Sequence, residues 1–150
     1  MLNALAVVAA TVLGTMVGVE FAVAVFVNPN LRRLPAGPSL QARADGARVG
    51  GRVMPFWYFA SLLLTAGLAA ATWGTAAAGA AIAAVVLLAV SVVMSIALLV
   101  PINNRTATWT ADDHPDDWRE QQQRWDRLHY VRVAIIVAGF VLTLVSGTVA

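Results

Sequence analysis

Four long apolar runs dominate this sequence, and each is long enough to cross the hydrocarbon core of a bilayer as a helix. The chain is 59% hydrophobic and only 12% charged, whereas a soluble domain carries about 25% charged residues. So few polar groups cannot cover a surface in water, and the solvent of this chain must therefore be lipid. We predict an all-α integral membrane four-helix bundle, folded as a single membrane domain over residues 1–150.

Prolines, asparagines and polar links mark the expected ends of the helices. Asn28-Pro29-Asn30 should end the first helix, because the residue before proline is pushed out of helical geometry. Pro55 suits the first turn of the second helix, and Pro101 with Asn103-Asn104 should end the third. A helix starting near His114-Pro115 should run unbroken into the fourth span. The expected spans are about residues 4–27, 54–73, 76–100 and 129–149, with cytoplasmic segments at about 28–53 and 101–128.

The first polar segment and the third span carry two weaker patterns. Residues 39–48 have the pattern of a short amphipathic helix at the membrane surface, although Gly46, Gly50 and Gly51 disfavour a helix there. The first and third spans also end alike, with valine, proline and asparagine followed by arginine. Two helical hairpins related by a rough duplication would explain this similarity.

The distribution of charge predicts topology. All ten basic residues are arginines, and they lie in the two polar segments or at the foot of the fourth span. The positive-inside rule then puts this face in the cytoplasm and both termini on the non-cytoplasmic side. The abundance of alanine and valine suggests a GC-rich bacterial genome, and we therefore predict a location in a bacterial inner (plasma) membrane. A net charge of +2 is too small to indicate nucleic-acid binding, and the absence of cysteine excludes disulfides and thiolate metal sites.

Glu20 is the only charged residue well inside a predicted span. A carboxylate in hydrocarbon costs several kcal/mol, so such a residue normally faces the bundle interior and has a partner. It is a functional candidate, and the alternative is a purely structural link between helices. Gly14 and Gly18 form a small-xxx-small pair one turn earlier, which we assign to helix packing.

The fourth helix presents a second group of candidates. Trp125, His129 and Arg132 are spaced by four and three residues and therefore share one helical face. Arg132 is a candidate partner of Glu20, Asp126 or an anionic ligand, and the alternative is snorkelling to lipid headgroups. Glu20, Asp126 and His129 also form a candidate metal set, although non-heme iron sites commonly use two histidines and one carboxylate.

Several motifs together resemble the anthrone-oxygenase-like family, whose other members are mostly catalogued as a domain of unknown function. In the first two spans they are Gly18-x-Glu20-Phe21 and Met54-Pro55. Further along, they are Val100-Pro101-Ile102-Asn103-Asn104, then Trp109, then Arg124-Trp125-x-x-Leu128-His129-x-x-Arg132. The resemblance extends over essentially the whole chain. It implies a four-helix membrane protein and, as in members from polyketide pathways, oxidation of an anthrone to an anthraquinone by molecular oxygen.

The chemistry of such an oxidation requires a base and donors to the developing oxyanion. The base candidates are His129 and Glu20; we expect His129 as base, Glu20 as its orienter or a proton relay, and Arg132 as a donor. Many relatives have asparagine-histidine before the final arginine, whereas this chain has His129-Tyr130-Val131-Arg132. The substrate-binding candidates are Asn28, Asn103, Trp109, Trp125 and Phe21.

The expected partners are the lipid bilayer and a small aromatic or lipophilic ligand, with no nucleic acid, and homo-oligomerisation is open. No cofactor is expected, although iron or copper at Glu20, Asp126 and His129 is an alternative. Two other functions stay open at this point. One is a non-enzymatic membrane protein that binds a lipid, a small molecule or a partner protein, and the other is a metal-dependent membrane oxidoreductase.

Overall fold

The computed structural model describes residues 1–149, and this part of the chain forms helices joined by short links, with no strand. Four helical rods account for the fold, and each is long and apolar enough to cross a membrane. The predicted all-α membrane architecture is therefore confirmed. The elements are α1 (Leu2–Ala22), η1 (Val23–Val27) and α2 (Asn28–Arg33) in the first rod, α3 (Ala36–Ala71) in the second, α4 (Ala78–Met94), η2 (Ser95–Leu99) and α5 (Val100–Thr106) in the third, and α6 (Trp118–Val149) in the fourth.

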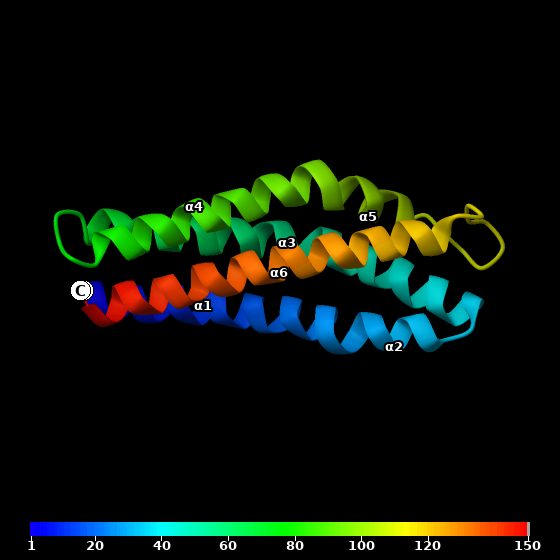
Figure 1. Cartoon of the computed structure of the whole chain (residues 1–150), viewed down its shortest axis with the longest axis horizontal. Helices are drawn as coiled ribbons and strands as arrows, with labels where there is room; N and C mark the ends of the chain where they lie inside the picture. The colour runs from blue at the N-terminus through cyan, green and yellow to red at the C-terminus, as the bar shows by residue number, and fades with distance from the viewer. Residues whose placement is uncertain (150) are drawn as a thin grey trace.

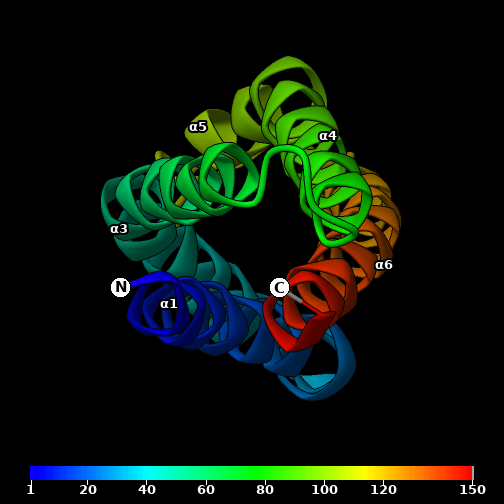
Figure 2. The ribbon, with the colours of Figure 1, turned by 90° about the vertical axis from the view of Figure 1, so that its left-hand side faces the viewer.

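The rods form an up-and-down ring in which consecutive rods pack side by side (Figures 1 and 2). α1 packs against α3 and α6, and α4 packs against the same two helices from the other side. One apolar core joins the first, third and fourth rods. It consists of Leu13 and Met16 of α1, Leu88 of α4 and Ile136 of α6, which are at most 1% exposed. Tyr58 joins this core from α3. Ridge-to-groove contacts between apolar side chains thus hold the ring together.

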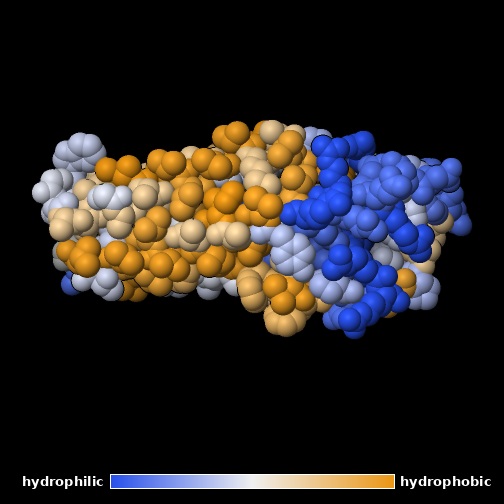
Figure 3. Space-filling view, in the orientation of Figure 1, coloured by the Kyte–Doolittle hydropathy of each residue, from blue (hydrophilic) through white to orange (hydrophobic). Residues whose placement is uncertain are grey.

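Hydrophobic residues cover most of the outer surface along the rods, and hydrophilic residues gather at one end (Figure 3). That end holds the link between α2 and α3 and the link between α5 and α6, whereas both termini lie at the opposite end (Figures 1 and 2). An apolar surface of this extent suits contact with lipid rather than water. Which compartment the hydrophilic end faces stays a prediction.

The prediction that Asn28-Pro29-Asn30 and Pro101 end their helices is wrong, because both rods continue through these prolines. η1 is a π turn, in which the N–H of Asn28 bonds to the oxygen of Val23, five residues earlier. η2 repeats this pattern directly before Pro101. A proline ring collides with the carbonyl four residues before it, and the wider π turn moves that carbonyl aside.

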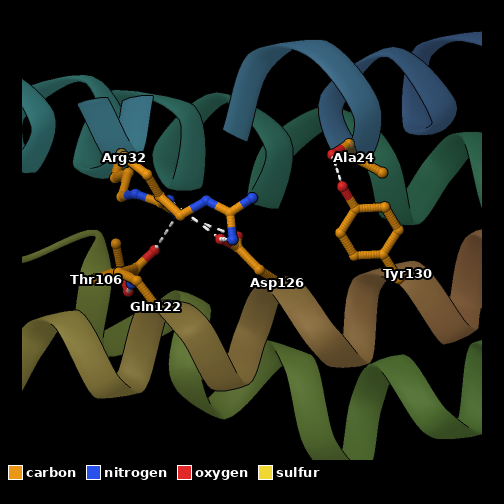
Figure 4. Close-up of polar contacts among 7 residues, drawn as sticks. Ala24, Arg32, Thr106, Gln122, Asp126 and Tyr130 are labelled. Atoms are coloured by element: carbon orange, nitrogen blue, oxygen red, sulfur yellow. Dashed lines mark hydrogen bonds and ion pairs between the residues drawn. The ribbon is translucent and has the colours of Figure 1, made fainter. Parts of the chain in front are cut away.

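The two π turns begin the same number of residues before their prolines, which agrees with a rough duplication of the first and third spans. Because Pro29 has no N–H, it cannot donate a hydrogen bond to a carbonyl of the preceding turn. The hydroxyl of Tyr130 on α6 instead donates a 2.7 Å hydrogen bond to the Ala24 oxygen in η1 (Figure 4). Tyr130 therefore satisfies a backbone group within the π turn and ties η1 to α6.

The second rod also differs from its prediction, because α3 is one continuous helix that includes Pro55 in its interior. The segment 39–48, predicted as a separate surface helix, forms its first turns, with Leu40, Arg43 and Ala44 buried. Tertiary packing of these buried side chains outweighs the low helix propensity of the glycines. The unbroken fourth helix was predicted correctly, although it begins at Trp118, slightly later than expected.

Alanine substitutions at Gly14 and Gly18 of α1 should show which of the two glycines is needed for helix packing. A Cβ on Gly14 would lie 2.9 Å from the Phe140 ring of α6, whereas a Cβ on Gly18 would meet nothing within 4 Å. We expect Gly14→Ala to destabilise the bundle by about 1–3 kcal/mol through overpacking. Gly18→Ala should be neutral or stabilising by up to about 1 kcal/mol. Thermal unfolding in one detergent measures both, and equal destabilisation would contradict the packing of α1 against α6.

Candidate functional site

Glu20, His129 and Arg132 meet in the interior of the bundle, where α1 packs against α6. They are only 4%, 1% and 8% exposed. Arg132 Nη2 donates to Glu20 Oε2, and His129 Nδ1 lies 3.3 Å from the same oxygen. The carboxylate in the first span therefore faces the bundle interior and is paired, as expected for a charged group in a membrane helix.

The hydrogen bonds of His129 assign its tautomer. Its Nε2 lies 3.1 Å from the backbone oxygen of Glu20, which can only accept a hydrogen bond, so Nε2 carries the proton. Nδ1 then presents a lone pair, which accepts a 2.9 Å hydrogen bond from Arg132 Nη2. The ring of Trp125 stacks on the imidazole with centroids 4.6 Å apart. These contacts fix a neutral imidazole whose basic nitrogen faces the arginine and the carboxylate.

Arg132 has two further contacts that hold its guanidinium in place. Nη1 donates a 3.1 Å hydrogen bond to Ser95 Oγ in η2, and Cζ lies 5.3 Å from the centre of the Tyr58 ring on α3. The cation is thus held by groups from all four rods when Glu20 on α1 is included. Burial of an arginine at this depth is tolerated because a carboxylate, a hydroxyl and an aromatic face replace water.

A cavity of about 440 Å³ adjoins this trio and reaches all four rods. Its size falls in the range of small-molecule sites, roughly 300–1,000 Å³. Most of the lining is apolar, with Glu20, His129 and Arg132 on the wall. Asn28 and Asn103, two of the predicted binding residues, also line it. A mostly apolar cavity with a few convergent polar groups is the usual form of a ligand site.

Four buried polar groups of the cavity lining have no hydrogen-bond partner among the described residues. They are Asn28 Nδ2, the Tyr58 hydroxyl, Trp125 Nε1 and Arg132 Nε. An unpaired buried donor costs about 1–3 kcal/mol, and the three nitrogen groups can only donate. The cavity therefore offers hydrogen bonds to a ligand that carries acceptor oxygens.

The other predicted site residues lie apart from the trio. Trp109 packs with Leu40 and Trp118 in a separate buried cluster near the hydrophilic end and does not line the cavity. Phe21 is 45% exposed and packs edge-on against Phe26, so it too lies outside the cavity lining. The walls next to the trio come instead from Trp125 and from apolar residues of α3 and η2.

A second polar network, which sequence reasoning missed, includes Arg32, Thr106, Gln122 and Asp126 (Figure 4). Arg43 of α3 forms two 3.2 Å hydrogen bonds to Asp126 of α6 and a third, of 2.9 Å, to Gln122. Gln122 in turn donates to Thr106 Oγ1 at 2.7 Å, and Arg32 approaches Asp126 at 3.9 Å. The available signal was the spacing of Gln122, Asp126 and His129, which places all three on one face of the last helix.

This network includes Asp126, one of the residues of the candidate metal set. Within residues 1–149, no three histidine, aspartate or glutamate side chains gather as a metal set. Asp126, one of the three candidates, is bound by Arg43 instead. Glu20, Asp126 and His129 therefore do not form a common metal site in this arrangement.

Removal of the carboxylate from a buried and from an exposed ion pair should show how burial changes the contribution of an ion pair to stability. The Arg43–Asp126 pair is buried, with side chains 4% and 3% exposed, whereas the Arg48–Asp45 pair has side chains 44% and 58% exposed. We expect Asp126→Ala to cost about 3–5 kcal/mol, because it leaves a buried guanidinium unpaired. The control Asp45→Ala should cost less than about 1 kcal/mol. Chemical unfolding in detergent measures both, and similar costs would refute the structural role of the buried network.

One comparison with known proteins gives a match. The family model described as anthrone oxygenase matches residues 47–142, which is more than half of the chain. The match includes Asn103, Trp125, His129 and Arg132, and it begins after Glu20. No curated protein and no solved structure shows significant similarity to this chain. The family predicted from the motifs is therefore confirmed.

Proposed function

Because the chain belongs to the anthrone oxygenase family, we propose that it is a membrane oxygenase that oxidises an anthrone-like, enolisable aromatic substrate with molecular oxygen. One observation carries this proposal. A histidine with an unprotonated ring nitrogen, a carboxylate and a guanidinium share one wall of an apolar cavity inside the bundle. Base-assisted oxygenation of a flat apolar substrate needs these groups together.

The reaction is feasible because the methylene group of an anthrone is acidic. Loss of one C–H proton to a base leaves an electron pair that makes the central ring aromatic, as an enolate. The enolate carbon then forms a C–O bond with oxygen, which is reduced to a peroxide and takes up a proton. Loss of the second C–H proton, with cleavage of the O–O bond, forms the carbonyl and releases water. Each turnover therefore consumes one oxygen molecule and converts the methylene to a carbonyl.

His129 is the proposed base because Nδ1 is its unprotonated nitrogen. Glu20 Oε2, 3.3 Å away, would stabilise the imidazolium that forms. Arg132 Nη2 caps the same nitrogen, and a small shift of this guanidinium toward the substrate oxygen would free the lone pair. The same shift would place a cation on the oxygen where the enolate charge develops. Proton removal and charge stabilisation are thereby coupled through one arginine.

The setting of the reaction is part of the proposal. We place the protein in a bacterial inner membrane, with the arginine-rich end in the cytoplasm according to the positive-inside rule. Hydrophobic residues cover most of the outer surface along the rods (Figure 3), so a lipophilic substrate would approach the cavity while remaining dissolved in the bilayer. The natural substrate is proposed only as a class, an enolisable aromatic ketone.

Turnover of anthrone by protein in lipid nanodiscs tests the reaction. Wild-type protein should oxidise anthrone to anthraquinone faster than nanodiscs without protein, with matching oxygen uptake. His129→Gln should lower the rate by about 10²–10⁴-fold, the usual contribution of a general base, and Glu20→Gln should also lower it. The matched controls His114→Gln and Glu120→Gln change residues outside the cavity lining and should retain wild-type rates.

Three results would contradict parts of this proposal. Wild-type turnover in both His129→Gln and Glu20→Gln would remove these residues from the reaction. No excess rate over protein-free nanodiscs would favour the non-enzymatic alternative, in which the cavity only binds a lipid or small molecule. Stoichiometric iron or copper in the purified active protein would favour the metal-dependent alternative.

A further inference from the structure

Gly46 and Gly50 of α3 line the cavity, and no close contact between helices requires a glycine at either position. A Cβ added to Gly46 or Gly50 would meet no atom within 4 Å. Neither has a positive φ, since among the described glycines only Gly74 does. Each glycine costs a helix interior about 1 kcal/mol relative to alanine. Their position on successive turns leaves an open groove along α3.

The groove faces the first rod and reaches the apolar outer surface. On the α3 side, Val49 and Val53 line the cavity while remaining 61% and 48% exposed. On the other side, Val27 at the end of η1 lines it and is 44% exposed. Between η1–α2 and α3 the cavity thus has an exposed rim, and this rim is apolar. Ile96 and Val100 of the third rod also line the cavity and are 60% and 40% exposed. A rim of this kind faces lipid more readily than water.

An unpaired amide lies inside this rim. Asn28 is only 5% exposed and lines the cavity, and its Nδ2 has no hydrogen-bond partner among residues 1–149. This amide belongs to the first turn of α2, directly after the π turn. A buried donor without a partner is an independent sign of a ligand, because an acceptor oxygen would recover the lost hydrogen bond.

We propose that the seam between η1–α2 and α3 is a lateral access groove and an acceptor subsite. A flat apolar ligand leaves the bilayer through this groove, slides over Gly46 and Gly50, and places a carbonyl or hydroxyl oxygen on Asn28 Nδ2. This subsite is distinct from the Glu20–His129–Arg132 trio and holds the ligand at a second point. The inference rests on the proposed function only for the aromatic nature of the ligand, not for any chemical step.

Filling the groove tests the access route. The probe is anthraquinone, whose binding to nanodisc-embedded protein is followed by quenching of tryptophan fluorescence in stopped flow. Gly50→Leu and Gly46→Leu place a side chain in open space and favour the helix, so the fold should persist. We expect each to slow association by about tenfold, equivalent to about 1.4 kcal/mol. The control Gly79→Leu, a helical glycine with equally open surroundings outside the cavity lining, should associate at the wild-type rate.

Removal of the amide tests the acceptor subsite. Asn28→Leu keeps a similar volume without a donor, and Asn30→Leu is its exposed control. We expect Asn28→Leu to weaken anthraquinone binding by about tenfold, the loss of one buried hydrogen bond. Anthracene, which has the same three rings without oxygens, should bind both variants and the wild type equally. Asn30→Leu should leave both probes unaffected.

The outcomes separate the subsite from the reaction. Unchanged association in both glycine variants, equal weakening of the two probes by Asn28→Leu, or no binding of anthraquinone to the wild type would overturn the subsite. If the expected binding pattern is found but anthrone is not oxidised, the reaction is refuted and the subsite stands. If oxidation proceeds at wild-type rates in Gly50→Leu and Asn28→Leu, the subsite is refuted and the reaction stands.

Discussion

The buried ion pair between Glu20 and Arg132 is the interaction on which the rest of the site depends. Neither charge is tolerable in an apolar bundle alone, because desolvation of each ion costs several kcal/mol. Their pairing joins the first and last helices and brings His129 against the same carboxylate. A hydrophobic replacement would serve stability as well or better, so stability alone does not explain the pair.

Two prolines lie next to π turns that contribute residues to the cavity lining. Each is preceded by a π turn rather than by a helix end, so the first and third rods continue toward the hydrophilic end with a local displacement. Ser95 in η2 and Ala24 in η1 contact Arg132 and Tyr130 of α6 through the displaced turns. Disturbed helical hydrogen bonding next to a cavity is a common feature of functional sites.

Much of the candidate site was predictable from local pattern and chemical cost. A single carboxylate in an apolar run requires a partner, and the spacing of Trp125, His129 and Arg132 places one within reach on a single helical face. The predicted ends of the first and third helices were wrong, because local rules for proline and asparagine do not include the π turn that accommodates Pro29. Trp109 was predicted in the ligand-binding wall but packs with Leu40 and Trp118 instead. From sequence alone, an aromatic residue near the membrane interface is equally compatible with a ligand-binding wall and with a packed loop.

The sequence by itself determined that this chain is a membrane bundle of four helices, because apolar length and scarce charge leave no other way to satisfy the backbone in lipid. It also determined that Glu20 must turn inward. Only the tertiary structure decided that Arg43 pairs with Asp126, that α3 stands away from the π turns to leave a cavity, and that Asn28 lines this cavity without a partner. These features depend on how separate helices meet, and no local pattern specifies the distance between residues on different helices.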